Sequence, residues 1–112
     1  MYIGEISKKT GLSIKAIRFY EERGLIQTPE RKGRYRVYQQ KDVELLILIK
    51  EAKALGVTLS QLKGVIVYKN DRVDWASIKQ FLSEFREELV AKSKDINNKI
   101  ANIDRCFEQI MC

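Results

Sequence analysis

The side chains best suited to chemistry in this sequence are arginines and lysines interleaved with tyrosines, and they gather near its beginning. Residues 1–38 hold nine basic and four acidic side chains, a net charge of +5, whereas residues 39–112 carry +1. Guanidinium and ammonium groups neutralise phosphates, and tyrosine hydroxyls donate hydrogen bonds to them, so the pattern favours a surface that binds a polyanion. A solvated basic surface without a ligand is the alternative, and charge alone does not separate the two.

Other kinds of chemistry are excluded by composition. The 112 residues include no histidine, so no imidazole can serve as a general base or a metal ligand. Paired acids around an apolar pocket, a glycine-rich phosphate loop and a cluster of metal ligands are also missing from the sequence. Glu21 and Glu22 are adjacent, so on a helix they point in different directions. The sequence therefore argues against an enzyme.

Two short helices are predicted to position the first of the basic residues. Residues 3–9 and 13–23 have helical patterns, a turn at Gly11 separates them, and Ser13 suits the N-cap of the second helix. This plan predicts a helix-turn-helix, whose second helix enters a DNA major groove; an ordinary helical hairpin is the alternative. The outer face of the second helix carries Lys15 and Arg18.

A basic hairpin is predicted after the two helices. Gly33 suits its turn, and residues 34–38 alternate between strand-forming types. After a helix-turn-helix such a hairpin is a wing; a plain basic loop is the alternative, and it explains the interleaved tyrosines less well. The side chains expected to contact phosphates are Arg31, Arg34, Tyr35, Arg36 and Tyr38.

A second pair of helices is expected to complete the small core. One helical pattern begins at Asp42 and stops at Gly56, and Thr58 and Gln61 then have the spacing of a capping box at the start of the next helix. The functional interpretation is a second helix pair that clamps a DNA phosphate through Lys53.

The remaining sequence predicts one long helix. After a connector at residues 68–72, the segment from Asp74 onward has no glycine or proline. A helix of about 36 residues within it would be roughly 54 Å long. An apolar residue recurs at every seventh position from Leu82 to Ile110, and the basic domain is too small to cover this stripe. The simplest way to cover the stripe is self-association as a homodimer; the alternative is that the helix folds back onto its own chain. The predicted dimer contacts are Ile78, Leu82, Phe85, Leu89, Ile96, Ile100, Ile103, Phe107 and Ile110.

Cys106 and Cys112 are the chain's two thiols. Six residues apart on a helix, they lie about 240° around its axis, so they chelate one ion only if the helix end unwinds. Cys106 is in register with Ile78 and Phe85, which favours a structural thiol buried in the dimer seam. The alternative is a soft-metal site for copper or zinc, or a thiol-redox site, and it includes an intersubunit pairing of Cys112 with Ser77. We expect no required cofactor, and a metal ion is one candidate effector.

Within residues 2–26, three segments with the sequences YIGEI, TGLS and AIRFYEERGLI resemble the N-terminal signature of the MerR-type transcriptional regulators. Residues 34–38 are similar to that family's wing, and residues 42–59 to its second helix pair. The resemblance follows the whole chain in order. It is strong over residues 1–60 and architectural afterwards.

The resemblance implies a mostly α-helical protein. Residues 1–70 would form a winged helix-turn-helix, and residues 71–112 a connector and a long helix in an antiparallel coiled coil with a second subunit. It further implies a homodimer on a dyad-symmetric site in double-stranded promoter DNA, which the dimer bends and untwists so that RNA polymerase engages both promoter elements. Carried over residue by residue, it implies contacts to the major groove or its phosphates from Ser13, Lys15, Arg18 and Tyr20, to the flanking backbone from Arg31, Arg34, Tyr35 and Arg36, and to a phosphate from Lys53.

Two further expectations concern the class of protein. No window approaches the ~20 apolar residues of a membrane span, and the first residues lack a signal-peptide pattern, so we expect a cytoplasmic protein without a membrane partner, associated with the nucleoid through DNA. A DNA-binding regulator of unknown effector is the leading hypothesis. A basic adaptor that dimerises and docks on an acidic protein is the alternative.

Overall fold

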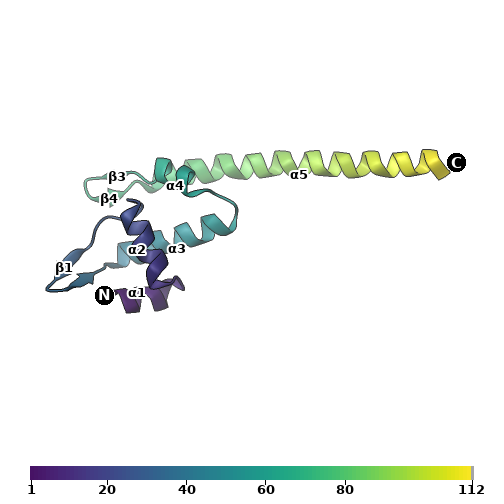
Figure 1. Ribbon diagram of the computed structural model, residues 1–112. Coiled ribbons are helices and arrows are strands. Elements are labelled where there is room, and N and C mark those ends of the chain that lie inside the picture. Colours follow the sequence, from purple (N-terminus) through teal and green to yellow (C-terminus); the bar gives the residue numbers. More distant parts are fainter. Residues whose placement is uncertain (112) are drawn as a thin grey trace. The chain divides into compact units, whose positions relative to one another are not determined.

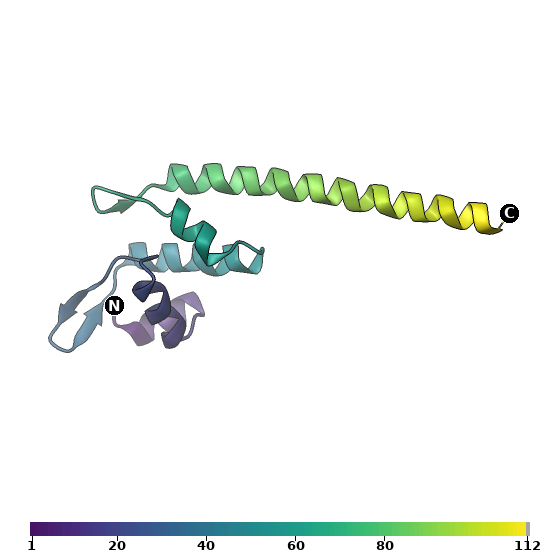
Figure 2. The same ribbon diagram turned by 45° about the horizontal axis from the view of Figure 1, so that its top comes forward.

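The computed structural model describes residues 1–111, which form two compact units, Met1–Val67 and a second unit that begins at Tyr68. The first unit contains α1 (Ile3–Thr10), α2 (Ile14–Glu22), β1 (Glu30–Lys32), β2 (Tyr35–Val37), α3 (Gln40–Ala54) and α4 (Leu59–Val65). Figures 1 and 2 show from two directions that α1, α2 and α3 lie together and that the hairpin β1–β2 extends away from them. This arrangement is the predicted winged helix-turn-helix.

Local hydrogen bonds build the turn between α1 and α2. Ser7 Oγ donates to the carbonyl oxygen of Leu12 at 2.6 Å, which closes the loop between the helices. Gly11 has a φ of +74°, in the left-handed region that glycine adopts without strain. Ser13 caps α2 as predicted, since its hydroxyl oxygen accepts from the amide of Ala16 at 3.0 Å.

The core of the first unit lies among its helices. Burying one large apolar side chain stabilises the fold by roughly 1.5–3 kcal/mol, so a cluster of buried side chains holds the helices against one another. The largest fully buried side chains are Ile6, Ile17, Leu25, Ile26, Tyr38, Leu45, Leu46, Ile49 and Val57.

The wing is an antiparallel hairpin in which Arg31 lies opposite Arg36. Gly33, with a φ of +65°, forms part of its turn as the sequence predicts. All three residues of β1 are exposed, so the ribbon has no core of its own. Its base is tied to the chain's first residue, because the Tyr38 amide donates to the carbonyl oxygen of Met1 at 2.6 Å.

Capping boxes set the beginnings of α3 and α4. The first of these helices begins at Gln40, two residues earlier than predicted, because the carboxylate of Asp42 reaches back and accepts from the amide of Gln39 at 2.8 Å. The predicted capping box of α4 is present: the Gln61 amide donates to Thr58 Oγ1 at 3.1 Å, and the Thr58 amide donates to Gln61 Oε1 at 2.9 Å.

The second unit begins with a small hairpin where the sequence predicted a plain connector. The strands β3 (Tyr68–Lys69) and β4 (Arg72–Val73) pair across a two-residue turn. Its residues, Asn70 and Asp71, have φ values of +51° and +60°. Such a turn requires two left-handed residues, and asparagine and aspartate tolerate that conformation better than most.

The helix α5 (Trp75–Met111) spans 37 residues, in agreement with the predicted long helix. Asp74 precedes it, and its Oδ2 accepts from Ser77 Oγ at 2.9 Å and from Lys69 Nζ at 3.3 Å. These two hydrogen bonds lower the pKa of Asp74. The carboxylate therefore stays charged at the positive end of the helix dipole.

The apolar stripe of α5 is exposed along most of its length. Ile78 is buried, Leu82 and Phe85 are half-buried, and the stripe is exposed from Leu89 onward. Cys106 is an exposed free thiol. Of the helices that the structure describes, none is long and apolar enough to cross a membrane. The members of the stripe that are more than half exposed are Ile96, Ile100, Ile103, Phe107 and Ile110.

Candidate nucleic-acid interface

The outer face of α2 presents the basic side chains that the sequence placed there. Lys15 and Arg18 are exposed and lie three residues apart on one face of the helix. Among the described residues neither forms an ion pair, so both charges face solvent. Ser13 is exposed beside them, with its hydroxyl oxygen already engaged in the cap of α2.

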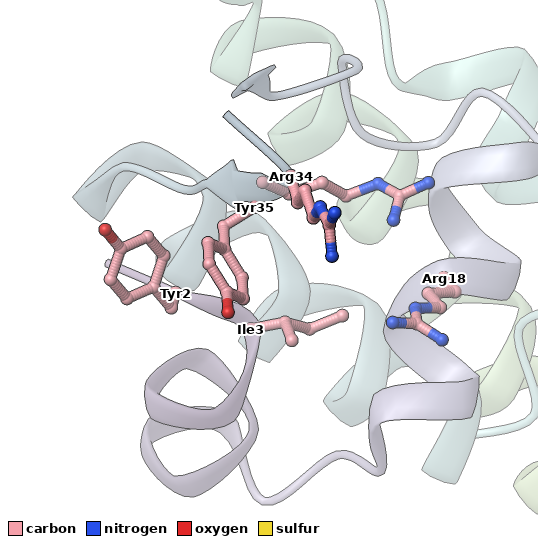
Figure 3. A pocket seen from close by; sticks show the side chains of 6 residues that line it. Tyr2, Ile3, Arg18, Arg34 and Tyr35 are labelled. Carbon is pink, nitrogen blue, oxygen red and sulfur yellow. The ribbon is translucent and has the colours of Figure 1, made fainter. Parts of the chain in front are cut away.

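A small pocket lies where the start of α1, α2 and the wing meet. Figure 3 shows Arg18 reaching from α2 toward the wing and Tyr2 beside Tyr35, whose ring centroids are 5.5 Å apart. Three guanidinium groups around one small space suit an anion with several oxygens, such as a phosphate. The pocket has a volume of about 70 Å³ and is lined by Tyr2, Ile3, Arg18, Arg34, Tyr35 and Arg36.

A nearly buried carboxylate joins the wing to α2. The side chain of Glu21 is 8% exposed, and its Oε2 accepts from Arg36 Nε at 3.1 Å. Its Oε1 accepts from the hydroxyl of Tyr38 at 3.2 Å. Burial, and then the negative charge of Glu21, raise the pKa of Tyr38 to about 12. The tyrosine hydroxyl therefore stays protonated, and donates to Glu21, further into the alkaline range than an ordinary tyrosine.

The structure corrects the expectation that Tyr20 and Tyr38 face DNA. Their side chains are 8% and 1% exposed, so neither reaches the surface. Tyr20 lies three residues after buried Ile17 and shares its inward face of α2. Tyr38 lies directly after the wing, where the chain returns to the core. Both tyrosines pack the fold that carries the interface.

The other predicted DNA contacts lie on the surface to different degrees. Arg31, Arg34, Tyr35 and Lys53 are exposed. Arg36 is half-buried, because Glu21 holds its Nε while the same side chain lines the pocket. The structure thus brings Arg18, Arg34, Tyr35 and Arg36 together around one pocket; Lys15, Arg31 and Lys53 do not line it.

Sequence reasoning missed Glu21 and two of the residues that line the pocket, Tyr2 and Ile3. A signal for Glu21 was present, since it follows the apolar Ile17 by four residues and a helix therefore places both on its inward side, whereas Glu22 points outward. Tyr2 precedes the first helix, and only the tertiary arrangement brings its ring beside Tyr35.

Comparisons with known proteins agree with this architecture. Residues 1–69 match the family described as MerR HTH family regulatory protein. The chain is 31% identical over 112 residues to the HTH-type transcriptional regulator CueR of Salmonella typhi, covering 99% of this chain and 77% of that protein. It is 35% identical over 112 residues to the mercuric resistance operon regulatory protein of Bacillus cereus, covering 97% and 79%. The solved structure of HiNmlR, a MerR family regulator lacking the sensor domain and bound to promoter DNA, has a TM-score of 0.56 at 20% identity and covers 96% of this chain and 78% of that one.

Proposed function

The chain belongs to the MerR family of helix-turn-helix regulatory proteins and is a DNA-binding transcriptional regulator, and on that premise we propose that it acts as a homodimer on a dyad-symmetric promoter site. Each copy of α2 enters one major groove, and each wing holds the backbone beside it. The dimer bends and untwists the site, so that RNA polymerase engages both promoter elements. Deforming DNA costs several kcal/mol, so a small change in dimer geometry shifts the balance between two DNA shapes.

The observation that carries this proposal is the pocket that α2 and the wing share. Arg18 comes from the helix and Arg34 from the wing, and both point into one space of about 70 Å³. Among the described residues, neither guanidinium has a carboxylate partner. A DNA backbone phosphate supplies the missing counter-charge, and it places α2 and the wing on the same stretch of duplex.

The exposed stripe of α5 supports the dimer. Ile96, Ile103 and Phe107 are 54–59% exposed, and Ile110 is 80% exposed. Soluble proteins rarely leave a contiguous apolar surface of this extent open to water. An antiparallel pairing of two α5 helices covers the stripe on both copies, and Cys106 then lies beside the seam. Two-fold symmetry of the protein in turn matches a dyad in the DNA.

Selection of genomic DNA fragments by the purified protein, followed by footprinting of the enriched fragment, tests the proposal. The expected result is a protected dyad whose half-sites lie one helical turn, or a multiple of it, apart. Failure to bind any duplex at low salt would overturn it and favour the basic adaptor that docks on an acidic protein. If this protein regulates a neighbouring operon, we expect the protected DNA to lie between the promoter elements of that operon.

A metal-responsive regulator is a second candidate, and the similarity to a mercuric resistance operon regulatory protein favours it. Cys106 is exposed and free, but the described residues hold no group of three side chains able to bind a metal ion. Such a site would need further donors, with Ser77 as one candidate; Cys112, the other, lies outside the described residues.

Native mass spectrometry of the dimer with copper(I), zinc or mercury(II), and separately with an oxidant, tests the metal and redox candidates. A fixed stoichiometry that disappears in Cys106→Ser supports a thiolate site. Absence of both metal binding and thiol modification removes it and leaves Cys106 with a packing role in the dimer seam.

A further inference from the structure

We propose that Glu21 is a positioning residue that holds the wing in register with α2, so that affinity for a chosen DNA sequence depends on it more than affinity for DNA in general. The inference rests on the proposed DNA-binding function. It assigns a role to a nearly buried acidic side chain beside the arginines of the interface, where a negative charge by itself opposes binding.

The geometry shows one carboxylate that serves both sides of the interface. Glu21 belongs to α2, whereas Arg36 and Tyr38 lie 15 and 17 residues later, in the wing and directly after it. Each carboxylate oxygen accepts from one of these partners, at 3.1 Å from Arg36 Nε and 3.2 Å from the Tyr38 hydroxyl. Two bonds in different directions fix the strand against the helix in both position and rotation.

Burial makes this arrangement demanding. The Glu21 side chain is 8% exposed, and a nearly buried carboxylate is stable only when hydrogen bonds and a counter-charge satisfy it. Every residue of β1 is exposed, and the wing's other contacts with the helical unit lie elsewhere: the hydrogen bonds between Met1 and Tyr38 at its base and the ring contact of Tyr35 with Tyr2. Neither of them ties the wing to α2. Loss of the carboxylate charge therefore frees the hairpin to move relative to α2 while the helical core stays packed.

The bond to Arg36 also orients the pocket. Glu21 engages the Nε of this guanidinium and so sets the plane of the group, and no described residue forms an ion pair with its terminal amino groups, which can therefore bind a ligand. The same side chain lines the pocket with Arg18 and Arg34. Glu21 therefore acts on DNA through another residue.

A positioning role for Glu21 and a purely electrostatic role predict opposite changes in DNA affinity for the same substitution. Glu21→Gln keeps the shape of the side chain and removes one negative charge per subunit. Electrostatics alone predicts tighter binding to every duplex, because the interface becomes more positive. Positioning predicts weaker binding to the selected sequence, because α2 and the wing no longer meet the duplex in a fixed register.

The experiment compares Glu21→Gln with Glu22→Gln in the full chain. Glu22 is the adjacent residue, is exposed and forms no ion pair among the described residues, so it supplies the same charge change without the wing contact. The probes are the duplex that the wild-type protein enriches from a random pool and a random duplex of equal length. Affinities are measured by fluorescence anisotropy, with the melting temperature as a folding control.

For Glu21→Gln we expect affinity for the enriched duplex to fall about tenfold, the scale of removing a charge-assisted hydrogen bond, with random-duplex affinity unchanged or slightly higher. For Glu22→Gln both affinities rise slightly and their ratio is constant. If Glu21→Gln instead tightens both duplexes as Glu22→Gln does, the carboxylate is a counter-charge only and the proposal is overturned.

Failure of the proposed function and misfolding of the variant are distinguishable from that result. If the wild-type protein enriches no duplex, the proposed function fails before the variant is tested. If Glu21→Gln does not fold, Tyr38→Phe decides, because it removes one of the two bonds without changing charge. We expect it to lower the enriched-to-random affinity ratio roughly two- to fivefold, and an unchanged ratio in that folded variant overturns the proposal.

Discussion

Lys50, on α3, donates a hydrogen bond from its Nζ to the carbonyl oxygen of Thr10 at 3.2 Å, across 40 residues of sequence. The contact places a cation at the C-terminal end of α1, where carbonyl groups lack helical partners. Gly11 follows directly, and a Cβ added there would lie 2.5 Å from the same Nζ. The turn of the helix-turn-helix is therefore held from α3, and the absence of a side chain at Gly11 leaves space for the contact.

Gly11→Ala is expected to lower the free energy of unfolding by about 1–2 kcal/mol, because its φ of +74° strains any residue with a Cβ. The end of the Lys50 side chain is flexible and swings away at little cost, so backbone strain dominates. Chemical denaturation of the two proteins measures the difference.

Gly4→Ala is the matched control. Gly4 lies inside α1, and nothing lies within 4 Å of an added Cβ. Alanine is the better helix former, so stability should be unchanged or rise by up to ~1 kcal/mol. Equal losses from the two substitutions would contradict the role given to the turn.

Arg34→Ala is expected to weaken binding to specific and random duplexes alike, since a phosphate contact carries no sequence information. The slope of log affinity against log salt should become shallower by about 0.9 for each DNA phosphate that the variant no longer neutralises. Anisotropy titrations over a range of salt concentrations measure both quantities.

Lys94→Ala provides the comparison for charge alone. Lys94 is exposed on α5 and carries the same formal charge as Arg34. Its removal should leave the salt slope nearly unchanged, because α5 is not among the elements that the proposed function places on DNA phosphates. Equal slopes for Arg34→Ala and the wild-type protein would refute the wing as a phosphate contact.

The raised pKa of the Tyr38 hydroxyl predicts that the folded protein loses stability at alkaline pH. Its pKa is about 12 in the folded protein against an ordinary value of 10. Below pH 10 both states hold the proton, so the contribution is complete; between pH 10 and 12 the unfolded chain ionises first, and stability falls by about 2–3 kcal/mol.

Unfolding of the wild-type protein and Tyr38→Phe between pH 8 and 12 isolates this contribution. The phenylalanine variant lacks one hydrogen bond and is less stable at neutral pH by roughly 0.5–1.5 kcal/mol, but its stability should fall less steeply above pH 10. Parallel curves for the two proteins would show that Tyr38 ionises normally.

The local features of the fold follow from the sequence because their causes are local. Ser13 caps α2, Gly33 lies in the turn of the wing, and Thr58 with Gln61 begins α4, each through contacts within a few residues. The small hairpin at Asn70 was missed because its strands are only two residues long and have no alternating pattern.

The long-range features could not be predicted in the same way. The contacts of Glu21 with Arg36 and Tyr38 span 15 and 17 residues, and nothing in their spacing specifies a pair. Tyr38 has the same residue type as exposed Tyr35, and only the packing at the base of the wing buries one and not the other. Residue type predicted the positive charge of the interface, whereas its internal carboxylate required the structure.

Arg18→Ala separates base reading from phosphate contact on α2. If Arg18 contacts a base edge, the substitution should reduce discrimination between the selected and random duplexes by ~1–3 kcal/mol. The ratio of the two dissociation constants is the measurement. A parallel fall in both affinities, with the ratio intact, would assign Arg18 to a phosphate in the pocket it shares with Arg34.

Ile96→Glu is expected to break the homodimer. Ile96 is 55% exposed in the single chain and lies near the middle of the apolar stripe of α5, so pairing two helices would bury two carboxylates without partners. Dimer affinity should fall by at least about a hundredfold, and binding to a dyad site should fall with it, because the half-sites are then bound independently.

Asn98→Glu is the control, since Asn98 is exposed and lies about 200° around the helix from Ile96. Sedimentation velocity at micromolar concentration distinguishes the cases. An Ile96→Glu protein that still sediments as a dimer would place the subunit contact elsewhere and leave the exposed stripe to another partner.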